Sequence, residues 1–269
     1  MGQVVDTVVM LPEGKAIQGV TSLAGEVYVL RDKGRGQVEV YDVIDYRLQY
    51  CLTVPDARGF IDMTSCAHYR CVYIADPVVK CVHRLDIQGA ATRWPVNDRP
   101  WGLSVNAAHN VLVTCCEVHK IKEFSSHGDL LRELTLPDDV IHLLHAIQTC
   151  NGQFIVCHGA ADDAVHSVCK ISNDGRAIVH SHGGRRGSGT GQYNVPVRLA
   201  VDKNEFVFVV DLINSRVKLL SPTLDYMRQV VSSDQLKWLP YRLCLDTQRR
   251  RLYVADSTSY TGRIVVFSV

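Results

Sequence analysis

The chain has 269 residues, 46% of them hydrophobic, and a formal net charge of +1. This length exceeds a typical domain, but closed all-β folds commonly reach it as one unit, and the hydrophobic content excludes a disordered chain. No apolar run approaches the roughly 20 residues that span a bilayer, so no membrane partner is predicted, while the near-neutral charge leaves nucleic acid open as a partner.

Short apolar segments with similar endings recur along the whole chain. In order they are 27–31, 72–76, 111–115, 153–157, 207–211 and 252–256, and the best copies end in aspartate. Their last residues lie 39 to 54 positions apart, which is the length of four short strands with turns. One blade of a propeller has this composition, and it needs neighbouring blades because it cannot bury both faces alone.

Each repeat is expected to begin with an innermost strand. These openings are 17–23, 60–66, 99–106, 142–148, 194–202 and 239–246. The fifth repeat is the clearest, because its apolar residues alternate with period two and Pro196 begins its first strand, where no ladder donor is needed. The sequence therefore predicts an all-β fold, a six-bladed β-propeller of four-stranded blades.

The last repeat supplies only three strands, ending with 263–269. Residues 4–11 have the pattern of the missing fourth strand, and their pairing with 263–269 would close the ring and remove exposed sheet edges. We therefore expect residues 1–269 to form a single, monomeric propeller domain.

The ten cysteines are interpreted as reduced. Most lie within or beside apolar strand segments, where free cysteine acts as a small hydrophobe, and no Cys-x-x-Cys pair is matched by a second metal-binding pair. The N-terminus has neither the basic nor the apolar region of a signal peptide. These features predict a cytoplasmic protein.

A motif in the fifth repeat resembles a known family. Residues 187–196, Gly-Ser-Gly-Thr-Gly-Gln-Tyr-Asn-Val-Pro, are followed by Val201-Asp202, Val209-Val210-Asp211, Asn214 and Arg216-Val217, and together they resemble an NHL repeat. Such propellers often form the C-terminal domain of tripartite-motif (TRIM) ubiquitin ligases, where they recruit protein or RNA. The resemblance implies a substrate-targeting module, although the RING, B-box and coiled-coil parts of that family are absent from this sequence.

The glycine-rich stretch 183–191 is interpreted as a flexible loop between blades. It lacks the Gly-Lys-Ser or Gly-Lys-Thr ending of a P-loop, and a proline-led strand follows it instead of a helix. The loop is nevertheless placed to present Arg185 and Arg186 to a phosphate or an acidic partner.

Propeller enzymes need polar side chains where several innermost strands begin, at the mouth of the channel. The corresponding positions are predicted to be Gly19, Asp62, Gly102, Leu144, Arg198 and Arg242. Peptidyl-hydroxyglycine amidating lyases resemble this architecture and bind zinc through histidines there, but only His142 and His145 lie near one such position, and a catalytic zinc needs three protein ligands. Calcium-dependent lactonases need carboxylates that converge on the metal ion, and at this position the positive charges of Arg198 and Arg242 would repel calcium. No metal and no cofactor are predicted, and a lyase or lactonase is the third alternative.

The channel mouth is therefore predicted to be a recognition surface. The candidate binding residues are Arg198, Arg242, Tyr241, Trp101, Arg185, Arg186, Arg216 and Asp62. Guanidinium and aromatic groups together suit a protein partner, which is the leading hypothesis, and they also suit an unstacked RNA base, which is the alternative. The non-functional interpretation is a solvated rim with salt bridges between blades.

Overall fold

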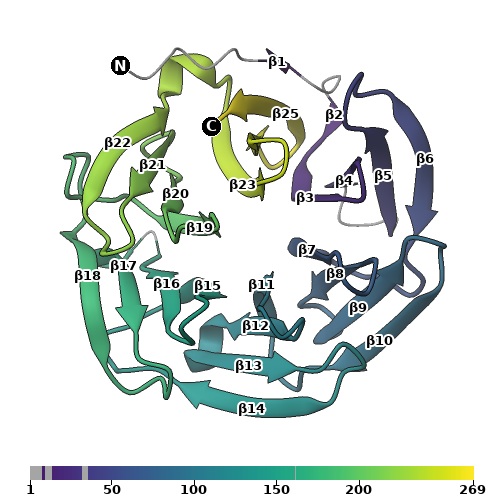
Figure 1. The fold of residues 1–269 in the computed structure, drawn as a ribbon. Helices are drawn as coiled ribbons and strands as arrows, with labels where there is room; N and C mark the ends of the chain where they lie inside the picture. Colours follow the sequence, from purple (N-terminus) through teal and green to yellow (C-terminus); the bar gives the residue numbers. More distant parts are fainter. Residues whose placement is uncertain (1–7, 10–13, 32–35, 161) are drawn as a thin grey trace.

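The computed structural model describes residues 8–9, 14–31, 36–160 and 162–269. In this part of the chain six antiparallel sheets surround a central axis, which confirms the predicted six-bladed all-β propeller (Figure 1). In the first five blades four successive strands run from the axis outward, and in the sixth β23, β24 and β25 do so, so the inner strand of each blade comes first among these strands.

The strands of the first three blades occupy the N-terminal half. The first blade has β3 (Ile17–Leu23), β4 (Glu26–Arg31), β5 (Gln37–Asp42) and β6 (Leu48–Thr53). The second has β7 (Asp62–Cys66), β8 (Cys71–Asp76), β9 (Cys81–Asp86) and β10 (Ala91–Pro95). The third has β11 (Pro100–Val105), β12 (Val111–Cys115), β13 (Lys120–Phe124) and β14 (Leu130–Thr135), with the short 3-10 helix η1 (Cys116–Val118) before β13.

The C-terminal half forms the other three blades. The fourth has β15 (Leu143–Gln148), β16 (Phe154–His158), β17 (Val165–Ile171) and β18 (Ile178–Arg185). The fifth has β19 (Pro196–Val201), β20 (Val207–Asp211), β21 (Arg216–Leu220) and β22 (Tyr226–Val231), followed by the 3-10 helix η2 (Ser233–Gln235). The sixth has β23 (Leu239–Asp246), β24 (Arg251–Ser257) and β25 (Thr261–Ser268).

Two short N-terminal strands pair with β25 at the outer edge of the sixth blade. In β1 (Val8–Val9), Val8 lies opposite Val266 and Val9 opposite Val265. In β2 (Gly14–Lys15), both residues pair with the beginning of β25. The other residues of the predicted closing strand, 4–7 and 10–11, lie outside the described residues, so closure along the whole of 4–11 stays a prediction.

The hydrophobic core lies between neighbouring blades. Every residue of β8, β12, β16 and β20 is buried, because the second strand of a blade is covered on both faces. Alternate side chains of β8 join different cores: Tyr73 and Ala75 pack toward the third blade, whereas Val72 and Ile74 pack toward the first. The second strands are therefore continuous apolar segments, because successive side chains are divided between two neighbouring cores.

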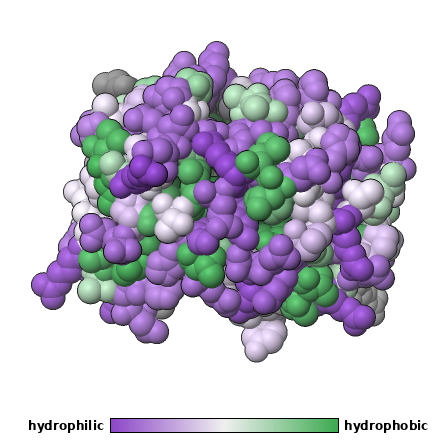
Figure 2. Space-filling view, turned by 90° about the horizontal axis from the view of Figure 1, so that it is seen from below, coloured by the Kyte–Doolittle hydropathy of each residue, from purple (hydrophilic) through white to green (hydrophobic). Residues whose placement is uncertain are grey.

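The edge of the propeller is more polar. Figure 2 shows hydrophobic side chains there as separate groups among hydrophilic ones. Leu48, Leu130, Leu131 and Met227 of the outermost strands are each about half exposed. Among the described residues, no helix is long and apolar enough to cross a membrane.

The repeated aspartates at the ends of second strands organise the neighbouring turns. Asp76, Asp211 and Asp256 are completely buried. Asp76 accepts hydrogen bonds from the backbone N–H groups of Val78 and Val79, at 3.0 and 3.3 Å, in the turn that follows its strand. Asp76 therefore stabilises the turn that follows its strand.

The same aspartates also fix the loop that leads into the inner strand of their own blade. Asp76 accepts the backbone N–H of Arg58 at 2.7 Å, and Asp256 accepts that of Trp238 at 2.6 Å. Burial alone would raise the pKa of Asp76, but hydrogen bonds from His83 and from backbone N–H groups lower it to about 2. These carboxylates therefore hold the loops from which the candidate site is built.

Candidate functional site

The two faces of the ring carry different loops. We call the face on which the inner strands begin the upper face. It also carries the loops that follow the second strands of the second, third, fifth and sixth blades, at 77–80, 116–119, 212–215 and 258–260. The opposite, lower face carries the turns that follow the inner strands, such as 24–25 and 247–250. The predicted channel mouth lies on the upper face.

A β-bulge near the start of five inner strands sets which side chains form the channel. The bulged residues are Gln18, Trp101, Leu144, Val197 and Tyr241. The residues that resume pairing are Gly19, Gly102, His145, Arg198 and Arg242, and Asp62 takes this position in the second blade. The sequence placed Leu144 in this ring, which is wrong, because the bulge moves Leu144 into the core and His145 into the ring.

Three charged side chains of this ring meet inside the channel. Arg198 of the fifth blade forms an ion pair with Asp62 of the second blade, and the Nε atom of Arg242 lies 3.7 Å from the same carboxylate. Arg198, Arg242 and Asp62 are only 4%, 3% and 2% exposed. The other Asp62 oxygen accepts the backbone N–H of Leu103 at 2.6 Å. The two arginines, predicted as binding residues of the channel mouth, are therefore buried beside Asp62 inside the channel.

Arg242 is held by backbone carbonyl groups of three segments. Its Nε atom donates to the oxygen of Gln18 at 2.8 Å, its Nη1 atom to that of Tyr241 at 2.9 Å, and its Nη2 atom to that of Ile61. The guanidinium carbon also lies 4.1 Å from the centre of the Tyr241 ring. Arg242 thus joins the sixth, first and second blades.

His145 connects the remaining blades and is neutral. Its Nε2 atom is 3.0 Å from the oxygen of Leu103, and its Nδ1 atom accepts the backbone N–H of Leu199 at 3.3 Å. This arrangement assigns the ring proton to Nε2. Burial, reinforced by the positive charge of Arg198, lowers the pKa of His145 well below its ordinary value. The polar ring therefore links all six blades through buried contacts.

A cavity of about 270 Å³ lies on the lower side of this polar ring. The four polar side chains Asp62, His145, Arg198 and Arg242 line it, together with hydroxyl-bearing and aliphatic residues of the inner strands. Because the charged cluster lies between the cavity and the channel mouth, the channel offers two separate sites, one on each side of the cluster.

At the mouth itself, the predicted aromatic residues Tyr241 and Trp101 are partly exposed. Trp101 packs its other side against the large core of the fourth to sixth blades. A shallow pocket of about 150 Å³ adjoins Tyr241, and its lining residues are Gln18, Leu212, Leu239, Tyr241, Ser257, Thr258 and Ser259. This pocket is of a size to accept a single side chain of a partner.

Sequence reasoning missed four exposed aliphatic residues that, together with Tyr260, form a set of exposed apolar residues on the upper face. Tyr260 is 88% exposed, Val78 63%, Ile213 49%, Val118 39% and Val79 38%. All five lie in loops that follow second strands, in four different blades. Their signal in the sequence is an apolar residue within four positions after the end of the repeated segment, where a turn residue is expected. We call these five residues the upper-face apolar set.

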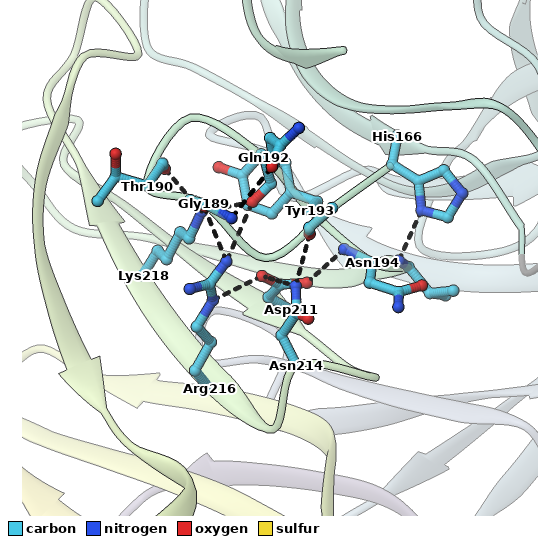
Figure 3. A network of polar contacts seen from close by, with 12 residues as sticks. His166, Gly189, Thr190, Gln192, Tyr193, Asn194, Asp211, Asn214, Arg216 and Lys218 are labelled. Carbon is cyan, nitrogen blue, oxygen red and sulfur yellow. Dashed lines mark hydrogen bonds and ion pairs between the residues drawn. The ribbon is translucent and has the colours of Figure 1, made fainter. Parts of the chain in front are cut away.

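The glycine-rich loop is held in place by the fifth blade, as Figure 3 shows. Arg216 pairs with Asp211 at 2.7 Å and donates to the carbonyl oxygens of Gly189 and Gln192. Arg216, predicted to bind a partner, is therefore a residue that organises this loop. Arg185, the last residue of β18, and Arg186 after it are both exposed on the side of the upper face, so residues 183–185 of the predicted loop belong to a strand.

Lys218 completes this network from inside. Its side chain is 1% exposed, and its Nζ atom donates to the carbonyl oxygens of Gln192 and Thr190 at 2.6 and 2.7 Å. It also lies 4.4 Å from the centre of the Tyr193 ring. Burial, with a contribution from nearby Arg216, lowers the pKa of Lys218 to about 8.

The acidic part of the upper face is formed by the fourth blade and the segment that leads into it. Asp138, Asp139 and Asp162 are exposed, whereas Asp163 pairs with His142 at 2.8 Å. Within the described ranges, no group of three or more His, Cys, Asp or Glu side chains is arranged to hold a metal ion.

No known family model and no curated protein sequence matches the chain. Its structure resembles a streptogramin B lyase, with a TM-score of 0.69 at 10% identity over 98% of this chain and 97% of the other. It also resembles virginiamycin B lyase from Staphylococcus aureus, with a TM-score of 0.67 at 11% identity over 97% of this chain and 98% of the other. A third similar structure is hydrazine synthase from Kuenenia stuttgartiensis, with a TM-score of 0.66 at 13% identity over 95% of this chain and 96% of the other. At these identities the likeness establishes the six-bladed propeller fold alone.

Proposed function

We propose that this chain is a non-catalytic recognition propeller that binds a protein partner through its upper face. One observation carries this proposal: the upper-face apolar set places exposed apolar side chains on loops of four blades, all on one side of the ring. Exposed apolar residues that share one face are typical of interaction sites. The lower face offers a useful contrast, because its turns are dominated by polar residues, with Ile44 as an isolated exposed apolar residue.

The sixth blade provides the strongest anchor for such a partner. Tyr260 is almost fully exposed and lies directly after Thr258 and Ser259, which line the pocket beside Tyr241. Tyrosine is enriched at the centres of interfaces because it buries a large area while keeping a polar tip. A partner that covers Tyr260 and inserts a side chain into this pocket would bury both aromatic residues.

The NHL resemblance extends this proposal to substrate targeting for a TRIM-type ubiquitin ligase. In that role the propeller selects the substrate, and catalysis belongs to other domains. RNA binding is the alternative, and the exposed Arg185 and Arg186 would serve it. The apolar set favours protein, because four of its five members are aliphatic and cannot stack on bases.

The test compares capture by the purified chain, immobilised, with capture by two variants from cell extract, with and without ribonuclease. The variant Ile213→Asp with Tyr260→Asp places charges in the upper-face apolar set, and Ile44→Asp is the matched control on the lower face. We expect the wild type and the control to retain the same proteins and the double variant to lose them. Retention by the double variant, or capture that ribonuclease abolishes, would contradict the proposal.

A further inference from the structure

The cavity below the polar ring carries an unbalanced charge. Of the residues that line it, only Asp62, Arg198 and Arg242 are charged, and His145 is neutral. Two guanidinium groups and one carboxylate leave a net charge of +1 at this end of the cavity. All three charged side chains are at least 95% buried. An uncompensated buried charge is costly, so the site is electrostatically suited to one additional negative charge.

Arg198 holds the donors that such a charge needs. Arg242 has its Nε, Nη1 and Nη2 atoms occupied by backbone carbonyl oxygens. Arg198, by contrast, has Asp62 as its one hydrogen-bonding partner among the described residues, through Nη2. A guanidinium carries five N–H donors in a planar fork, so most donors of Arg198 remain for a ligand in the cavity that it lines.

The walls and opening of the cavity suit a small polar ligand. Thr21, Ser22, Thr64, Ser65 and Ser104 bring hydroxyl groups to the lining. Nearer the lower face, the lining includes the partly exposed residues Val105, Ile147 and Val201, so a ligand has a route from solvent. A volume of about 270 Å³ accommodates a small oxyanion with several water molecules.

We propose that this cavity binds a small oxyanion, either a carboxylate or an inorganic anion such as phosphate, with Arg198 as its main ligand. The planar fork of Arg198 donates two parallel hydrogen bonds to two oxygens of the anion, as arginine does to carboxylates and phosphates. Arg242 supplies charge at close range, and Asp62 keeps both guanidinium groups in place. This site is separate from the proposed protein-binding surface, because the charged cluster lies between them.

The experiment titrates the purified chain with sodium phosphate and, separately, sodium acetate, against sodium chloride at equal ionic strength. Isothermal titration calorimetry gives the dissociation constant, and thermal unfolding gives Tm. We expect saturable binding of at least one oxyanion and a matching rise in Tm. Tighter binding of phosphate would identify an inorganic anion as the ligand class, and tighter binding of acetate would identify a carboxylate. Wild-type protein that shows neither saturable heat nor an oxyanion-dependent rise in Tm would overturn the proposal.

Two variants that change the cavity charge make the test directional. Arg198→Gln removes the main ligand and should abolish binding, whereas Asp62→Asn raises the cavity charge to +2 and should tighten binding by about tenfold. Arg176→Gln is the matched control, because it removes the same charge from a side chain that is 85% exposed. If Arg198→Gln does not fold, Asp62→Asn alone decides. If the folded variants of Arg198 and Asp62 bind the oxyanion as tightly as the Arg176→Gln control does, the proposed site is wrong.

Discussion

Arg198 of the fifth blade and Asp62 of the second blade form an ion pair across the channel, and each side chain is at least 95% buried. Breaking a buried pair leaves the surviving charge without compensation, which typically costs about 3–5 kcal/mol. We therefore expect Asp62→Ala to lower the free energy of unfolding by about this amount, because it strands two arginines. Urea denaturation measures the change. The exposed pair Arg176–Asp174 is the control, since its loss should leave the free energy of unfolding almost unchanged.

The buried histidines predict loss of stability in mild acid. Burial lowers the pKa of His158 to about 4, and that of His145 well below its ordinary value, whereas both take up protons near pH 6.5 when unfolded. Their contribution is therefore complete above pH 6.5 and falls as the pH drops, by about 1.4 kcal/mol per histidine per pH unit until the folded state is protonated. Unfolding free energies measured between pH 7.5 and 5, in steps, should show this slope.

The variant His145→Gln separates this effect from other titrations. It keeps a hydrogen-bonding side chain beside Leu103 and Leu199 but removes the titrating group that faces Arg198 and Arg242. We expect its stability to depend less steeply on pH in this range. An unchanged slope would show that His145 is already protonated in the folded protein.

The fold was predictable because its signal is repeated. The second strands are short apolar segments that end in residues such as Asp76 and Asp211, so each copy supports the assignment of the others. The charged cluster was only half predictable. The sequence identified Arg198, Arg242 and Asp62 as openings of inner strands, but their pairing depends on closing the ring, which brings the second blade opposite the fifth. The spacing of these residues along the sequence does not show how close their side chains lie in the closed ring.

The fourth blade shows a second limit of sequence reasoning. The β-bulge at Leu144 inserts one residue and exchanges the roles of Leu144 and His145, and nothing in the local composition marks a bulge there. The aliphatic members of the upper-face apolar set were missed for a different reason. Isolated apolar residues in turns are common, and only the ring topology shows that Val78, Ile213 and Tyr260 share one face.

Lys218 is expected to control the order of the glycine-rich loop. Its ammonium group donates to the carbonyl oxygens of Thr190 and Gln192, so Lys218→Met leaves partly buried carbonyl groups without their donor, at a cost of about 1–3 kcal/mol. The loop should then open more often, and trypsin should cleave after Arg185 and Arg186 faster than in the wild type. Lys203→Met, at an exposed lysine of the lower face, should leave the cleavage rate unchanged. Equal rates for both variants would mean that the loop is held by Arg216 alone.

Tyr241 should contribute to partner binding through its ring. It is partly exposed, lines the upper-face pocket and stacks on the buried Arg242 guanidinium. Tyr241→Ala should weaken binding of the captured partner by about 1–3 kcal/mol, whereas Tyr241→Phe should bind like the wild type, because the ring carries the contact.

A titration at two salt concentrations identifies the partner class. A protein partner gives a shallow salt dependence that Arg185→Ala with Arg186→Ala hardly alters, while RNA gives a steep dependence that this pair flattens. A steep salt dependence, together with unchanged binding by Tyr241→Ala, would show that the partner binds at the glycine-rich loop and not at the pocket.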